Sequence, residues 1–136
     1  ILAFFWRDWA ALQLPQTLAG LNLRDDTQTI VIGSKYFSTP DMRGLETMTV
    51  QDLSEYRSPL DPATAEVNAI LAEAPIEAEF VDVMDLLCDG QESCRVFTPT
   101  GEMISHDNRY LTQEGARYLG SLLFSSDGPL SRFGRN

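Results

Sequence analysis

Residues 27–33 read Thr-Gln-Thr-Ile-Val-Ile-Gly, a β-branched and apolar run that ends in glycine. Such side chains fit the pleated surface of a sheet, so this run predicts a strand. An apolar run, Ile1–Trp6, precedes it, and apolar side chains at helical spacing lie between the two at positions 9, 12, 14, 18 and 21. We expect Pro15 to interrupt that helix. Ile1–Trp6 should form a strand buried on both faces, as in a parallel sheet.

The same order recurs further along the chain. Residues 34–59 have no period and predict a loop region with a short helix near Val50–Tyr56. Asp61 followed by Pro62 is typical of a helix start, and apolar spacing continues to Ala74. Residues 79–83 predict a third strand. The alternation favours an α/β fold with three layers, α/β/α, around a mostly parallel sheet with its ligand site at the carboxyl ends of the strands.

The carboxy-terminal region predicts one more helix. Thr112 is placed to cap it, and apolar residues, among them Ala116, recur at helical spacing as far as Leu123. Residues 125–136 show no period and predict a flexible tail. The predicted domain therefore covers residues 1–124.

Composition restricts the partners. The 136 residues include 20 acidic and 10 basic side chains, which give a net charge of -10 and argue against nucleic acid as a partner. No apolar stretch approaches the roughly 20 residues that span a bilayer. Because the chain opens on an apolar run without an initiator Met, we expect it to be part of a longer protein, with the neighbouring strands of its sheet encoded upstream.

The two cysteines predict a disulfide. Cys88 and Cys94 enclose a polar loop of five residues, short enough for the pair to bond. A reduced pair in a cytosolic protein is the alternative, whereas a disulfide would indicate an oxidising compartment. Only one His is present, which argues against a metal site, and no cofactor is predicted.

Candidate chemistry lies in the loop before the terminal helix, where His106 stands beside Asp107. An imidazole and a carboxylate are two parts of a hydrolytic site that also needs a nucleophile and oxyanion donors. An ordinary turn role for Asp107 remains the alternative, since Asp-Asn is common turn chemistry. Ser34, after Gly33, lacks the Gly-x-Ser-x-Gly frame, and its position favours a structural turn serine.

One pattern resembles a known family. The segments Cys88-x5-Cys94 and Gly101, and then Asp107-x-x-Tyr110-Leu111-Thr112-x-x-Gly115-Ala116, resemble the carboxy-terminal part of SGNH-type (GDSL-like) hydrolase domains, especially those fused to bacterial membrane O-acyltransferases of cell-surface sugars. The resemblance spans residues 1–124. It implies an SGNH/flavodoxin-like fold, and a serine esterase or O-acetyltransferase that acts on acylated carbohydrate or a small acyl ester. It also implies a periplasmic or cell-surface location and a membrane acyltransferase domain in the parent protein.

The resemblance also assigns site residues. In that family the Asp and His of the block belong to the catalytic triad, so Asp107 matches the carboxylate while Tyr110 stands in the place of the histidine. A phenol with a pKa of about 10 is a poorer proton acceptor at neutral pH than an imidazole at about 6.5. Either His106 takes the role of the base, or the domain is a catalytically degenerate scaffold for glycan or protein binding. The Gly-Asp-Ser nucleophile block is not found in the sequence and is expected upstream of the first strand.

Overall fold

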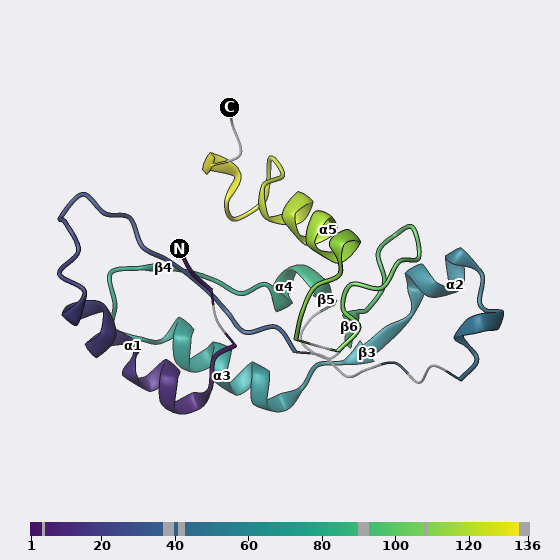
Figure 1. Ribbon diagram of the computed structural model, residues 1–136, viewed down its shortest axis with the longest axis horizontal. Coiled ribbons are helices and arrows are strands. Elements are labelled where there is room, and N and C mark those ends of the chain that lie inside the picture. The colour runs from purple at the N-terminus through teal and green to yellow at the C-terminus, as the bar shows by residue number, and fades with distance from the viewer. Residues whose placement is uncertain (4, 37–39, 41–42, 90–92, 108, 134–136) are drawn as a thin grey trace.

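A parallel sheet lies between two helical layers. The computed structural model describes residues 1–3, 5–36, 40, 43–89, 93–107 and 109–133. The sheet has the strand order β1 (Leu2–Ala3), β2 (Ile30–Ile32), β4 (Glu79–Val81), with every pair parallel. Helices α1 (Asp8–Gly20) and α3 (Pro62–Ala72) pack together on one face, and α5 (Gln113–Leu123) lies on the other (Figure 1). The predicted α/β fold with a parallel sheet is confirmed.

The central strand is buried on both faces because its side chains alternate. Val31 is fully buried against Leu14 of α1 and Leu71 of α3. Ile30 points to the opposite face, where it packs with Val81 of β4. Side chains of a strand alternate between the two faces of a sheet, so three apolar residues in a row serve both helical layers.

The first strand departs from the prediction. β1 spans only Leu2–Ala3, and Ile1 is 76% exposed, so this run is not buried on both faces. Among the described residues, β1 pairs with β2 alone and forms the edge of the sheet. Phe4 lies outside the described residues. Trp6 is buried, and its indole Nε1 donates a hydrogen bond of 2.8 Å to the carbonyl of Ile32.

Helix α1 is continuous through Pro15, so the predicted interruption is wrong. A proline inside a helix costs about 3 kcal/mol, because it removes one backbone hydrogen bond and crowds the preceding turn. The burial of Ala11 and Leu14 in the layer shared with α3 offsets that cost. Leu12, counted in the sequence as part of the apolar stripe, is 67% exposed.

A second, antiparallel sheet was not predicted. Its strands run in the order β3 (Arg57–Pro59), β6 (Ser93–Arg95), β5 (Cys88–Asp89), at the end of the molecule that also holds α2 (Val50–Glu55) (Figure 1). The shorter elements are η1 (Leu45–Thr47), α4 (Met84–Leu87) and η2 (Ser131–Phe133). The sequence predicted a loop where β3 lies, because a strand of three residues with a proline shows no alternation of its own.

The predicted disulfide is present between Cys88 and Cys94. It joins β5 to β6, and Cys94 is fully buried beside Val96 and Ile104. The middle of the enclosed loop, residues 90–92, lies outside the described residues. The disulfide therefore ties the small sheet into the core that α5 covers.

Part of the segment 125–133, for which the sequence predicted a flexible tail, is packed on the domain. Leu130 is 2% exposed and lies against Ile30 and Val81, and its amide donates to the carbonyl of Leu123 at 2.9 Å. Arg132 forms an ion pair with Glu79 of β4. The buried residues of this segment, Gly128 and Leu130, are isolated in the sequence, which is why no sequence period reveals the contact. Residues 134–136 lie outside the described part of the chain.

Helix α5 begins against the backbone of the preceding segment. The Thr112 hydroxyl accepts a hydrogen bond from the amide of Gly115 at 2.8 Å, as the cap prediction requires. A Cβ atom on Gly115 would lie 2.1 Å from the carbonyl oxygen of Ile104. Only a glycine permits this approach, which fixes the helix over the loop that carries Asp107. Ala116, predicted on the apolar face, is exposed.

We expect Gly115→Ala to destabilise the protein by about 3 kcal/mol, because the added methyl overlaps backbone that cannot move aside. Gly120→Ala is the matched control in the same helix, since nothing lies within 4 Å of its Cβ position. That change should be neutral or stabilise by about 0.5–1 kcal/mol through helix propensity. Urea unfolding measures both; equal effects of the two variants would contradict the close approach.

Candidate functional site at the carboxyl edge of the sheet

The carboxyl ends of all three parallel strands meet at one edge of the main sheet. Phe5 and Arg7 follow β1, Gly33 and Lys35 follow β2, and Asp82 follows β4. The backbone segment 105–111, which an isolated bridge between Ser105 and Leu111 closes into a loop, lies at the same edge. Two adjoining cavities open here, as expected for a parallel α/β sheet.

A buried polar network joins the strand ends. The Trp6 amide donates to the Ser34 hydroxyl at 3.1 Å, and the Ser34 amide donates to Oδ1 of Asn68 at 2.8 Å. Nδ2 of Asn68 donates in turn to the Ser34 carbonyl at 3.0 Å and to Oδ1 of Asp82 at 2.8 Å. Asn68 belongs to α3 and is 3% exposed. One amide side chain therefore connects the ends of β2 and β4 to a helix.

Ser34 has a structural role in this network. Its side chain is 2% exposed, and its hydroxyl accepts the Trp6 amide. This supports the interpretation as a turn serine. Asp82 also accepts the amide of Met84 at 2.8 Å. Burial raises the pKa of the Asp82 carboxyl above 3.8, while its hydrogen bonds with Met84 and Asn68 act in the opposite direction.

We expect Asn68→Ala to cost about 2–4 kcal/mol of folding free energy, because the buried amide and carbonyl of Ser34 lose their partner. Glu66→Ala, on the exposed part of the same helix, should change stability by less than about 0.5 kcal/mol. Chemical unfolding monitored by circular dichroism compares the two variants. A cost for Asn68→Ala no larger than that for Glu66→Ala would show that the network does not hold the strand ends.

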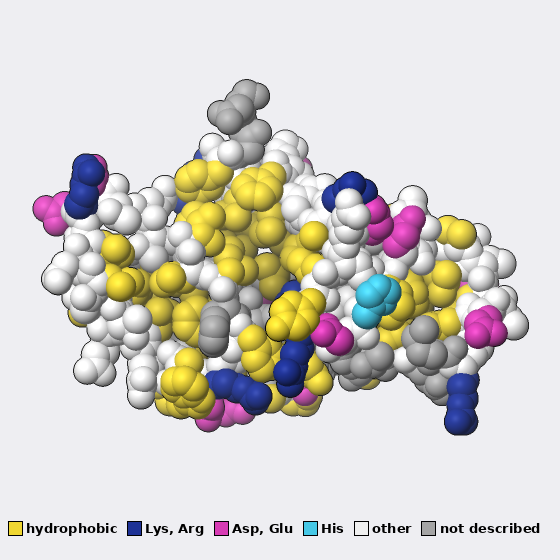
Figure 2. All heavy atoms as spheres, in the orientation of Figure 1, with side chains coloured by type: hydrophobic (Ala, Val, Ile, Leu, Met, Phe, Trp, Pro, Cys, Tyr) yellow, Lys and Arg dark blue, Asp and Glu magenta, His cyan; other side chains and the backbone are white. Residues whose placement is uncertain are grey.

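The larger cavity, of about 580 Å³, is mostly apolar. Its walls are Ala3, Phe5, Ile32, Gly33, Val83, Tyr110, Leu111 and Leu119, and its two charged lining residues are Lys35 and Arg109. Figure 2 shows hydrophobic side chains gathered over the middle of the molecule, with Lys and Arg side chains beside them at the lower edge of the view. A volume of this size lies in the range of small-molecule sites.

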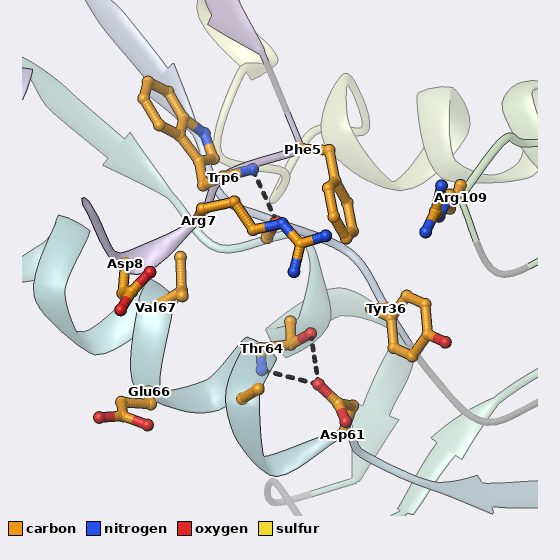
Figure 3. A pocket seen from close by; sticks show the side chains of 12 residues that line it. Phe5, Trp6, Arg7, Asp8, Tyr36, Asp61, Thr64, Glu66, Val67 and Arg109 are labelled. Atoms are coloured by element: carbon orange, nitrogen blue, oxygen red, sulfur yellow. Dashed lines mark hydrogen bonds between the residues drawn. The ribbon is translucent and has the colours of Figure 1, made fainter. Parts of the chain in front are cut away.

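The smaller cavity, of about 460 Å³, is more polar and shares Phe5 and Arg109 with the larger one. Figure 3 shows the Arg7 guanidinium directed toward Phe5, with Tyr36 and Thr64 nearby. Asp61 also lines this cavity, where it accepts hydrogen bonds from the amide and hydroxyl of Thr64 at 3.0 and 3.2 Å. These bonds cap α3, as the sequence predicted.

Asp107 holds the shape of its own loop. Its Oδ1 atom accepts the backbone amides of Arg109 at 3.0 Å and Tyr110 at 2.8 Å. The bond from Tyr110 and then that from Arg109 lower the pKa of the Asp107 carboxyl below 3.8, and the positive charge of Lys35 adds to the effect. The carboxylate is therefore ionised at neutral pH, and its loop presents Arg109 to both cavities.

Within the described residues, no hydrogen bond or ion pair joins the side chain of either of the other two predicted site residues to that carboxylate. Tyr110 is 75% exposed and lines the apolar cavity, and its backbone amide donates to Asp107. His106 is exposed, and no hydrogen bond of its imidazole is found within the described part of the chain. The catalytic roles of Asp107, His106 and Tyr110 thus remain predictions. The described residues hold no group of three His, Cys, Asp or Glu side chains that could bind a metal ion.

Lys35 links the loop to the strand end. Its Nζ donates a hydrogen bond to the Arg109 carbonyl, and the ammonium lies within electrostatic reach of Asp107. Burial lowers the pKa of Lys35 below 10.5, and the negative charge of Asp107 acts in the opposite direction. Lys35 is the one lysine of the chain, so its titration can be followed without overlap from other lysines.

We expect Asp107→Asn to lower the pKa of Lys35 further, because it removes the negative charge that favours the ammonium form. Reductive ¹³C-methylation followed by NMR titration measures this pKa on the 136-residue chain. Asp25→Asn, an exposed acid in the turn before β2, is the control and should leave it unchanged. An unchanged or higher pKa in the Asp107 variant would contradict the coupling.

Sequence reasoning missed several residues of this edge. Phe5, Arg7 and Arg109 were not singled out, although the first two follow a strand and the third lies inside the quoted block. A usable signal was available for Lys35, since the one lysine of an acidic chain follows a strand-ending glycine. Asn68 gave none, because one polar residue on an apolar helical face does not reveal its partners.

Comparison with known proteins found one family. The family model described as "SGNH domain (fused to AT3 domains)" matches residues 12–124. No curated protein matches the sequence significantly, and no solved structure does so either. The matched range includes the strands β2 and β4, the loop with Asp107, and α5.

Proposed function

This chain belongs to the family of SGNH domains that are fused to AT3 domains, and we propose that it is the carboxy-terminal part of an esterase or O-acetyltransferase domain for acylated cell-surface carbohydrate. The observation that carries the proposal is the position of Asp107. This residue of the matched block lies in the loop at the carboxyl edge of the parallel sheet and holds the backbone of Arg109 and Tyr110, which line the cavities there. Ligand sites of parallel α/β sheets lie at that edge.

Asp107 suits the role of the triad carboxylate. In serine esterases such a carboxylate orients the base and stabilises the cation that forms when the base takes the proton of the nucleophile. Two backbone amides hold Asp107 through Oδ1 and keep its pKa low, so it stays ionised while a base beside it titrates. Within the described residues, no hydrogen bond to Oδ2 of Asp107 is found, so this oxygen is available to accept one from an imidazole.

In this function His106 would be the base, and the nucleophile would be a serine outside these residues. His106 is the one imidazole of the chain and is adjacent to Asp107. Ser34 is unsuited to attack an ester, because it is buried and accepts the Trp6 amide. The serine would belong to a Gly-Asp-Ser segment that precedes Ile1 and reaches the same sheet edge.

A second candidate function is a binding scaffold without turnover. Tyr110 favours it, because a phenol replaces the histidine of the family block and is directed to solvent. The contacts that shape the loop, namely the Asp107 bonds to backbone amides and the Thr112 cap, need no active triad. In this case the cavities would hold an acylated glycan or a protein segment.

We also propose an extracytoplasmic location, periplasmic or at the cell surface. The disulfide between Cys88 and Cys94 is the kind of bond that persists in oxidising compartments. The family of domains fused to AT3 domains agrees with a membrane acyltransferase as the neighbouring domain. Within the described residues, no helix combines the length and apolarity that a membrane crossing demands.

Turnover of a chromogenic acetyl ester by the complete gene product tests the proposed activity. We expect Asp107→Asn and His106→Ala each to lower kcat by about 10²–10⁴-fold, because the base loses its orientation or is removed. Asp25→Asn, an exposed acid far along the chain from the loop, is the charge-matched control and should leave kcat unchanged.

The remaining outcomes discriminate between the candidates. No turnover by the natural protein, with no gain from Tyr110→His, would favour the binding scaffold. Full activity of His106→Ala would remove His106 as the base. A gain with Tyr110→His would show that the family position is still competent and that the rest of the site is intact.

A further inference from the structure

We propose that Arg7, Lys35 and Arg109 form a binding site for the anionic group of a saccharide, so that the substrate of this domain is an acidic carbohydrate. We call these three side chains the cation cluster. The saccharide part of the inference rests on the proposed function. The expectation that the ligand carries a negative charge comes from the cation cluster itself.

Phe5 brings two members of the cation cluster together. The guanidinium carbon of Arg7 lies 5.0 Å from the centroid of the Phe5 ring, and that of Arg109 lies 5.4 Å from it. In Figure 3 the two guanidinium groups lie on either side of the ring. Cation–π attraction fixes each group near the ring without using its N–H donors. The donors of both arginines thus remain available to a ligand.

The cation cluster is unusual in so acidic a protein. The chain carries a net charge of -10, yet among the described residues no ion pair is found for Arg7, Lys35 or Arg109. Three other arginines of the chain pair with acids, whereas Arg57 and Arg95 donate to backbone carbonyls. Arg24 pairs with Asp26, Arg117 with Glu114, and Arg132 with Glu79. In the described part of the protein Arg7 and Arg109 have no ion-pair partner, and Asp107 offsets only part of the cost of burying Lys35. Because the three positive groups lie where the two cavities adjoin, an anion from outside would complete the site.

The acids near the cation cluster have other tasks or remain apart. Asp61 caps α3 through Thr64. The negative charge of Asp107 offsets part of the cost of burying the Lys35 ammonium, but Oδ1 of Asp107 already accepts two backbone amides. Asp8 and Glu66 line the polar cavity together with Asp61, and within the described residues none of the three forms an ion pair with the cation cluster.

The surroundings fit a sugar ring that carries a carboxylate. Arginine offers a planar fork that matches a carboxylate in bidentate geometry, and the Lys35 ammonium has donors beyond the one used by the Arg109 carbonyl. The rings of Phe5 and Tyr36, with centroids 6.3 Å apart, provide apolar surface for the C–H face of a sugar. The polar cavity of about 460 Å³, lined by Arg7 and Arg109, has room for one or two such rings, and Lys35 lines the adjoining cavity.

Calorimetric titration of the 136-residue chain tests the proposal with two unacylated probes, a trimer of uronic acid residues and the same trimer with its carboxyl groups reduced to alcohols. We expect the anionic trimer to bind at least about tenfold more tightly, since only it makes charge-assisted hydrogen bonds. Raising sodium chloride from about 50 to about 500 mM should weaken that binding by screening. Equal binding of both probes, or no binding of the anionic one, would overturn the proposal.

Variants identify the cluster as the site. Lys35→Gln and Arg109→Gln should each weaken binding of the anionic trimer about tenfold, and Arg109→Lys should retain part of it. Arg24→Gln removes the same charge from an exposed turn and should have no effect. An equal loss in Arg24→Gln would show a general effect of net charge and would overturn the site. Because the probes carry no ester, this result is independent of turnover, and the esterase assay can fail or succeed separately.

Discussion

The amide side chain of Asn68 is the contact on which the functional edge depends. It occupies both the amide and the carbonyl of Ser34 and also donates to Asp82, so residues that follow β2 and β4 are held by one group from α3. Trp6 adds the end of β1 through the Ser34 hydroxyl. Parallel strands as short as these have few ladder bonds of their own. A buried and fully bonded polar group therefore determines where their ends lie.

The common edge at which the strands end explains why the positive side chains of the cation cluster lie close together. The residues after each strand end cannot continue into the sheet, and they emerge at the same edge as the loop that follows Ser105. Phe5 lines both cavities, and the loop fixed by Asp107 brings Arg109 to both of them. The cation cluster and the carboxylate are thus consequences of parallel strand direction together with one tight turn.

Asp107 illustrates how one residue can serve folding and chemistry. Its bonds to the amides of Arg109 and Tyr110 would shape the loop in a binding scaffold as well as in an enzyme. The same bonds keep the carboxylate ionised, which is the state that a triad needs. Family membership alone does not discriminate between an enzyme and a binding scaffold. The family match includes the fold that both functions need and also the block in which Tyr110 stands. The difference lies in which base, if any, reaches Oδ2.

Local patterns and a short block were sufficient to predict the alternation of strands and helices around the parallel sheet, the caps at Asp61 and Thr112, the disulfide and the family. Other features depend on contacts between residues far apart in the chain, so they are visible only in the folded structure. Helix α1 stays continuous through Pro15 because α3 packs against this helix. Leu130 is buried because it packs against Ile30 and Val81 on one face of the sheet. The polar network of Asn68 and the cation cluster around Phe5 are of this second kind. Their members are separated by tens of residues, and only the folding of the parallel sheet brings them to a common edge.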